Sequence, residues 1–285
     1  MIGFNLKRML NSKVRSMRTV KEFANFSGYL RKAYVEKVTQ HPASDDLGEI
    51  LKKYPKLVVA MNHGPMSGPL AGSVGMMNQY YKYGGEMRKP VVIAWRGFYK
   101  VPVVKYLVQY MSQVKNPPNL DGFAEKLNSG KATDIYVMPE GENCSFGNGL
   151  DIEPFLSPRF VELALKANTP ILIAVHVGSE LWSNIIPVND RLNPLLKYLP
   201  QKSYERIKDS GQVNVSLYGL KRIPELQMCF RLYEPQITLE DLKKPEGPQL
   251  LQQESDKIRE IMQSMIDEVV KERGLQHSEA SLRTA

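Results

Sequence analysis

At 285 residues the chain is long enough for one large domain, and 42% hydrophobic residues are ample for an apolar core. No stretch approaches the roughly 18 uncharged apolar residues of a membrane-spanning helix, and the N-terminus lacks the apolar core of a signal peptide. We therefore do not expect an integral membrane protein. Two widely separated cysteines indicate a reducing compartment, and four histidines argue against a dedicated metal site.

The formal charge of +8 is concentrated at the N-terminus. Residues 1–37 hold nine Lys or Arg against Glu22 and Glu36, which leaves the rest of the chain nearly balanced. This distribution argues against a nucleic-acid-binding surface spread over the whole protein.

Residues 1–42 are predicted to form a basic amphipathic element of two helices. Apolar residues recur at helical spacing in both helices, at Ile2, Leu6, Met9, Leu10, Val14 and Met17, and at Val20, Phe23, Phe26, Leu30, Ala33, Tyr34 and Val38. Two interpretations are open. The helices either pack on the domain with solvated Lys/Arg faces, or bind an anionic membrane surface, where each basic residue adds about 1 kcal/mol.

From Lys56 onward, short β-branched runs alternate with helical stretches. The runs "KLVVAM", "PVVIAW", "DIYVM" and "PILIAVHV" are typical of buried parallel strands. The segments between them, 67–83, 101–111 with 120–127, and 157–167, are long enough for crossover helices. Residues 43–273 are thus predicted to be an α/β domain with a largely parallel central sheet.

The C-terminal part is predicted to add two strands and a helix. The runs "VNVSLYG" and "MCFRLYEP" are expected to extend the sheet in antiparallel fashion. A clear apolar stripe predicts a helix over 249–273, and residues 274–285 are expected to be a disordered tail.

Ligands of open α/β sheets bind outside the carboxyl ends of the strands. Asn62 and His63 follow the first predicted strand, Arg96 follows the second, and Glu140 follows the third. We expect this histidine, arginine and glutamate to converge on one edge. His176 lies between two valines near the end of the fourth strand and is expected to be a packed core residue.

Four segments in order, "NHGPMSGP", "VPVVKYLVQYMSQVK", "VMPEGENCSFGNG" and "TPILIAVHVG", resemble the motif blocks of the glycerolipid acyltransferase family, the phosphate/lysophosphatidate type. The resemblance covers about residues 56–178. It implies acyl transfer from a thioester, acyl-CoA or acyl-ACP, to a hydroxyl or amine of a lysophospholipid, glycerol phosphate or related lipid. The acyl donor is a substrate, and no further cofactor is expected.

The resemblance also implies roles for individual residues. A neutral imidazole can take the acceptor's proton as it attacks the thioester, so His63 is the predicted general base. Backbone N–H groups of the glycine-rich turn, or of the following helix, would stabilise the oxyanion. The predicted supporting residues are Asn62, Ser67 and Glu140, and the predicted acceptor-binding residues are Arg96, Lys115, Glu140, Gly141 and Asn143.

Lipid substrates favour the membrane interpretation of the N-terminal element. We therefore expect a cytoplasmic protein that is peripheral on the inner face of the membrane. The anionic lipid surface would be bound through the basic N-terminal helices.

Two positions depart from the family pattern. Gly68 stands where an acidic residue should orient the histidine, and loss of such an acid in a serine-protease triad costs about 10⁴ in rate. Ser67 could at best orient the ring, and Glu140 or an acidic residue from elsewhere in the chain would have to supply the charge. Asn143 replaces a phosphate-binding arginine, so either Arg96, Lys115 or Arg159 binds the phosphate or the acceptor has none.

Several alternatives remain open from the sequence. Glu140 either binds the acceptor or only caps a turn through backbone N–H groups, and Arg96 is either functional or a surface cation stacked on Trp95. Cys144 follows the glutamate and suggests a rival Cys/His site. The two departures also suggest a degenerate acyltransferase fold that binds lipid or acyl thioester without turnover.

Overall fold

A computed structural model describes residues 17–102, 104–145, 147–188, 204–205, 207–208, 211–214 and 221–274. The first predicted N-terminal helix and the predicted tail after Gly274 lie outside these residues. No helix among the described residues is both long enough and apolar enough to span a bilayer.

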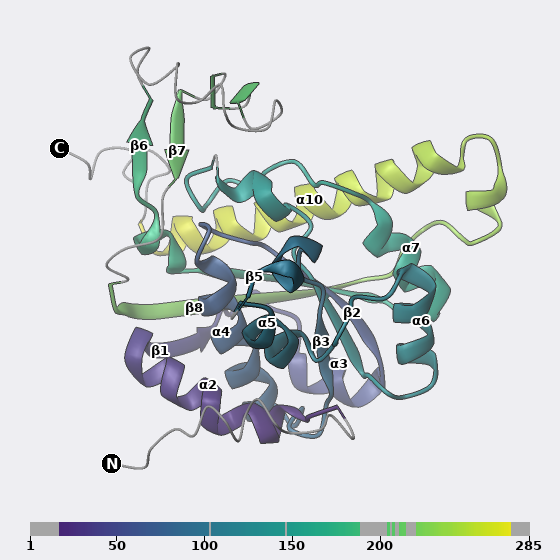
Figure 1. Cartoon of the computed structure of the whole chain (residues 1–285), viewed down its shortest axis with the longest axis horizontal. Coiled ribbons are helices and arrows are strands. Elements are labelled where there is room, and N and C mark those ends of the chain that lie inside the picture. The colour runs from purple at the N-terminus through teal and green to yellow at the C-terminus, as the bar shows by residue number, and fades with distance from the viewer. Residues whose placement is uncertain are drawn as a thin grey trace.

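Helices and strands alternate along the chain (Figure 1). The α-helices are α2 (Val20–Tyr34), α3 (Leu47–Lys53), α4 (Gly68–Lys82), α5 (Val104–Ser112), α6 (Leu120–Asn128), α7 (Arg159–Ala167) and α10 (Gly247–Glu272). The strands are β1 (Val35–Gln40), β2 (Leu57–Met61), β3 (Pro90–Val92), β4 (Asp134–Val137), β5 (Ile171–Val177), β6 (Ile185–Pro187), β7 (Gln212–Asn214) and β8 (Ile223–Tyr233). Short 3₁₀ helices are η1 (Arg96–Lys100), η2 (Gly141–Ser145), η3 (Ser179–Trp182) and η5 (Asp241–Lys243).

The main sheet has six strands in the order β1-β8-β5-β2-β4-β3. β5, β2, β4 and β3 run parallel to one another, and β8 runs antiparallel to β5. The predicted α/β class, the four predicted parallel strands and the antiparallel β8 are therefore confirmed. Every residue of β2 and β5 is buried, as expected for β-branched, apolar runs in the middle of a parallel sheet.

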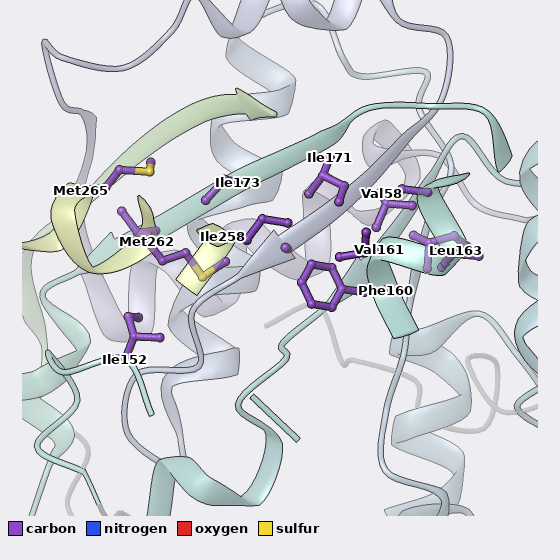
Figure 2. Packing of buried hydrophobic residues seen from close by; sticks show 14 of the residues in the cluster. Val58, Ile152, Phe160, Val161, Leu163, Ile171, Ile173, Ile258, Met262 and Met265 are labelled. Atoms are coloured by element: carbon purple, nitrogen blue, oxygen red, sulfur yellow. The ribbon is translucent and has the colours of Figure 1, made fainter. Parts of the chain in front are cut away.

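Successive strand residues point to opposite faces of the sheet, and each face has its own hydrophobic core. Val58, Ala60, Ile171 and Ile173 pack against α6, α7 and α10, whereas Val59, Met61 and Leu172 pack on the side of α2, α3 and α4. Figure 1 shows α10 across one side of the sheet and α2 on the other. In Figure 2, side chains of α10 meet those of β5 and α7, and the labelled contributors include Ile173, Val161, Ile258, Met262 and Met265.

The second predicted helix ends earlier than expected. α2 begins with a capping box between Thr19 and Glu22 and ends at Tyr34, and the next six residues form β1, which pairs in parallel with β8. The prediction that helical spacing continues to Val38 was therefore wrong. β-Branched Val35, Val38 and Thr39 suit a strand, and the partner that holds them there lies far along the chain.

The run "VNVSLYG" does not extend the main sheet as predicted in its described part. β7 pairs instead with β6 in a separate two-stranded antiparallel sheet. Both edges of β8 are already taken, by β5 and by β1, so β7 has no free edge of β8 to join.

A buried ion pair fixes the amino edge of the sheet. Arg88 donates to both carboxylate oxygens of Asp134, the first residue of β4, and to the carbonyl oxygens of Leu51 and Tyr54 at the end of α3. Tyr80 of α4 donates to the same carboxylate, and the Arg88 carbonyl accepts from the N–H of Val20. The guanidinium thus joins α3 to β4, while α4 reaches it through Asp134 and α2 through the main chain of Arg88.

Candidate active site

The turn after β2 is anchored to β5 through Asn62. Its buried side-chain amide donates to the carbonyl of His176, and its amide oxygen accepts from the N–H of His176 at 2.8 Å. This reciprocal pair satisfies both backbone groups of His176 and extends the β2–β5 pairing by one residue. The predicted supporting role of Asn62 therefore has a concrete form, in which it fixes the point where the turn departs from the sheet.

The imidazole of His63 is held by a backbone carbonyl. Its Nδ1 lies 3.3 Å from the carbonyl oxygen of Pro65. A carbonyl can only accept, so this contact assigns the proton to Nδ1 and the lone pair to Nε2. Burial lowers the pKa of His63 to about 4, against weaker opposing effects of backbone hydrogen bonds, so the ring is neutral at physiological pH.

Gly68 cannot carry the missing carboxylate without rearranging the turn. A Cβ at this position would lie 2.0 Å from the carbonyl oxygen of His63 and 3.2 Å from Cδ of Pro65. The N–H of Gly68 also donates to the Pro65 carbonyl at 2.7 Å. The same carbonyl oxygen therefore accepts from the Gly68 N–H, which closes the turn, and from Nδ1 of His63. The absence of an acid at position 68 is therefore a packing requirement of this turn.

Glu140 faces the backbone of the turn. One carboxylate oxygen accepts from the N–H of His63 at 2.6 Å, and the other accepts from the N–H of Glu153 at 3.1 Å. The carboxyl group is buried, and burial raises its pKa to about 7 although the two N–H donors favour the charged form. The structure thus favours the interpretation in which Glu140 caps backbone groups, and it does so by joining the histidine turn to the segment after the third strand.

The loop after Glu140 uses its polar groups internally. Asn143 is buried and donates to the carbonyl of Pro154 at 2.6 Å. Gly141 has a φ of +54°, and a Cβ there would meet the side chain of Leu156 at 2.3 Å. Asn143 therefore holds the loop together, and Gly141 lets the backbone turn beneath Leu156.

The rival Cys/His site is contradicted by the environment of Cys144. Its side chain is buried, and burial raises the pKa of the thiol to about 12, with nearby Glu140 adding to the effect. A nucleophilic cysteine needs the opposite surroundings, which favour the thiolate. Cys144 is a small apolar residue of the core.

The predicted acceptor-binding cations lie on the surface. Arg96 in η1, Lys115 and Arg159 are all exposed. Arg96 follows β3 and so lies on the same edge as His63, whereas the carbonyl of Lys115 accepts from Gln109 of α5. Trp95 packs edge-to-face against Phe98, and among the described residues no contact stacks Arg96 on it.

Beneath the His63 turn lies a buried layer that sequence analysis found only in part. His176 is buried as predicted, and its Nδ1 lies 3.1 Å from Oγ of Ser179. A Cβ on Gly64 or Gly72 would approach the His176 ring to 3.0 Å or less, so both glycines admit this ring. Burial lowers the pKa of His176 to about 4, and the neighbouring His63 adds to the effect.

Two buried polar atoms at this edge have no hydrogen-bond partner among the described residues, Ser67 Oγ and His176 Nε2. Ser67 was predicted to support His63, but the imidazole is held by Pro65 instead. Within the same residues, no three His, Cys, Asp or Glu side chains are grouped as a metal site would require. Sequence analysis missed the Pro65 carbonyl and Ser179, and only the Gly-Pro composition of the turn signalled a special backbone.

No protein-family model matches the chain, and no curated protein matches it. A solved structure that is similar to it is that of the 1-acyl-sn-glycerophosphate (LPA) acyltransferase PlsC from Thermotoga maritima, at 14% sequence identity and a TM-score of 0.39. The match covers 90% of this chain and 77% of that one. A likeness of this degree leaves the function to be argued from the residues of the site.

Proposed function

We propose that this protein is an acyltransferase that moves a fatty acyl group from an acyl thioester, acyl-CoA or acyl-ACP, to a hydroxyl or amine of a lysophospholipid, glycerol phosphate or related lipid. The observation that carries the proposal is the state of His63. Its ring is neutral, its Nδ1 proton is directed to the Pro65 carbonyl, and its Nε2 lone pair is left to act as a base.

The chemistry follows from that tautomer. Nε2 takes the proton of the acceptor hydroxyl as its oxygen attacks the thioester carbonyl, which forms a tetrahedral oxyanion. The C–S bond then breaks, and the departing thiolate recovers the proton from the imidazolium. Backbone N–H groups of the histidine turn, or of the start of α4, are the donors that we assign to the oxyanion.

The carbonyl of Pro65 supplies one of the two effects that the acidic residue has in the acyltransferase family. A carbonyl fixes the tautomer of the ring as a carboxylate would, but it carries no full charge to stabilise the imidazolium. The low pKa of His63 agrees with this difference. We therefore expect a weaker base than in a His–Asp pair, and slower turnover.

The surroundings of the base also bear on the acceptor. The side chains of Asn143 and Glu140 already form hydrogen bonds with backbone groups of the protein. We therefore assign acceptor binding to Arg96, which lies on the same sheet edge. Exposed Met66 and Leu156, which follow the two site loops, are apolar surface for the acyl chain. With Arg96 as the assigned cation, we expect an acceptor with at most one anionic group.

The test is an acceptor screen with purified full-length protein. Acyl-CoA or acyl-ACP is mixed with lysophospholipid, glycerol phosphate or an amine lipid, and release of free thiol is followed. Turnover should exceed that of His63→Ala with at least one acceptor, and Arg96→Ala should raise KM for that acceptor more than it lowers kcat. Equal rates for the wild type and His63→Ala with every acceptor would refute the proposal.

The packing of Gly68 favours a second candidate, a catalytically degenerate protein of the same fold that binds lipid or acyl thioester without turnover. The turn excludes the acid sterically, and Glu140 faces the backbone instead of the ring. In that case acyl-CoA should bind with equal affinity to the wild type and to His63→Ala, as measured by calorimetry, while no acceptor gives thiol release.

A further inference from the structure

The segment that follows β3 exposes an unusual number of large apolar side chains. We call it the η1–α5 surface and define it by Trp95, Phe98, Val101, Val104, Tyr106 and Leu107. Trp95 is 66% exposed, and Phe98 and Leu107 are 44% and 45% exposed. Single exposed apolar residues are ordinary, but a contiguous group of this kind marks an interaction site.

α5 is packed on the protein at its C-terminal end. Tyr110 makes edge-to-face contacts with Phe23 and Phe26 of α2, and Met111 lines a small apolar pocket with residues of α2 and α4. Val104 and Leu107 lie one turn apart at the start of the same helix and are exposed. The N-terminal part of α5 therefore keeps an apolar surface that the contact with α2 does not cover.

The charge around this surface has one sign. Residues 90–120 contain no Asp or Glu, and they contain Arg96, Lys100, Lys105 and Lys115. In the described part of the chain, none of these four cations forms an ion pair. Cations interleaved with exposed aromatic and aliphatic side chains match an anionic lipid interface, where the head groups meet the charges and the acyl region meets the apolar side chains.

Trp95 lies exposed across the chain beside Gly97. A Cβ on Gly97 would lie 2.2 Å from the Trp95 ring, so glycine leaves room for the indole in this position, and Phe98 contacts it edge-to-face. An exposed tryptophan is costly in water and favourable at the level of lipid head groups.

We propose that the η1–α5 surface docks on the anionic face of a phospholipid bilayer. This surface is distinct from the predicted N-terminal platform. Part of the apolar side of α2 is already occupied, since Val20 and Phe23 are buried, which leaves Tyr29 exposed together with charged side chains such as Lys21 and Lys32. Because η1 follows β3 on the edge that carries His63, docking would turn the candidate site toward the lipid.

The first test is co-sedimentation of the full chain with vesicles of phosphatidylcholine and phosphatidylglycerol. Phe98→Glu/Leu107→Glu should bind roughly 100-fold more weakly, since burial of each apolar side chain contributes about tenfold. The matched control is Tyr81→Glu/Leu239→Glu, which changes equally exposed apolar residues near the amino edge and should bind like the wild type. Lys100→Glu/Lys105→Glu leaves the apolar side chains in place and should weaken binding to anionic vesicles only.

The second test uses the intrinsic fluorescence of the two tryptophans. Trp182 is buried and gives a constant background, whereas Trp95 should be quenched by vesicles of brominated lipid. Trp95→Phe should abolish the quenching while leaving sedimentation with vesicles largely intact. Both tests are independent of acyl transfer, so they can succeed where the proposed function fails.

Three outcomes would overturn the proposal. The first is equal affinity of Phe98→Glu/Leu107→Glu and the wild type for the vesicles. The second is a lack of Trp95 quenching in vesicle-bound protein. The third is a wild type that binds no vesicles and sediments as a dimer, with Phe98→Glu/Leu107→Glu monomeric, which would make the surface a contact between copies of the chain. Retained vesicle binding after deletion of residues 2–16 would support the proposal over the N-terminal platform.

Discussion

Gly68→Ala tests whether the histidine turn tolerates any side chain where the acyltransferase pattern has an acid. The added Cβ would lie 2.0 Å from the His63 carbonyl oxygen, a backbone atom in a turn that is closed by the hydrogen bond from Gly68 N–H to the Pro65 carbonyl. The turn must open to relieve this contact. The same movement shifts the carbonyl that holds Nδ1 of His63.

The cost has two parts. Loss of one hydrogen bond in a buried turn costs about 1–3 kcal/mol, and forcing a methyl group into a packed site costs about 1–3 kcal/mol. Their sum, roughly 2–6 kcal/mol, corresponds to a fall in Tm of roughly 3–10 °C for a chain of this size. Thermal unfolding followed by circular dichroism measures it.

Gly28→Ala is the matched control. Gly28 lies inside α2, and a Cβ there would meet no atom within 4 Å, so this change should stabilise the protein by about 0.5–1 kcal/mol. Gly68→Asp separates sterics from chemistry, because it adds the same Cβ as Gly68→Ala together with the carboxylate. We expect both variants to lose stability and acyl transfer alike. A Gly68→Asp variant with the Tm of the wild type, or with faster thiol release, would refute the steric argument.

Three further predictions concern titration and reactivity. Because burial lowers the pKa of His63 to about 4, kcat/KM for acyl transfer should stay level from neutral pH down to about pH 4, and a fall near pH 6.5 would contradict this. His176 also has its pKa lowered to about 4, so the unfolded chain binds this proton first, and the free energy of unfolding should drop by up to about 3 kcal/mol between pH 6.5 and pH 4. Glu140 has the opposite effect, because its raised pKa favours the fold at low pH. Urea titrations of the wild type and of His176→Gln at each pH separate the two effects, since both proteins contain Glu140. If the free energy of unfolding changed with pH in the same way in both proteins, the prediction for His176 would be contradicted. Burial raises the pKa of the Cys144 thiol, so iodoacetamide should label Cys144 only in unfolded protein, and native protein treated with the reagent should keep its acyl transfer activity. Rapid labelling of native protein at pH 8 would contradict this, because it would show that the thiol is accessible.

Much of the fold was predictable because the central strands are determined by the residues of the strands themselves. Runs such as "KLVVAM" and "PILIAVHV" are β-branched, apolar and flanked by Pro or Gly, so they specify buried strands without help from distant residues. β1 was missed because Tyr34 and Val38 also fit a helical stripe. Its conformation is decided by pairing with β8, some 190 residues away in the sequence, which no local pattern reveals.

The site was predictable in its side chains and not in its backbone. The rule that ligands gather at carboxyl ends of strands correctly brought His63 and Glu140 together. It could not tell that Glu140 binds the main chain of His63, nor that the carbonyl of Pro65 contacts the His63 ring, because backbone groups are the same in every residue. Gly68 looked like a lost acid in the sequence, and the structure gives it a steric reason instead.

The buried Arg88–Asp134 pair makes the amino edge of the sheet costly to alter. Removing one partner of such a pair costs about 3–5 kcal/mol, and this one joins α2, α3, α4 and β4. Substitution of either partner should therefore disturb several elements at once. At the opposite edge the ties are separate hydrogen bonds, between Asn62 and His176 and from the His63 N–H to Glu140, so a substitution there should disturb one turn at a time.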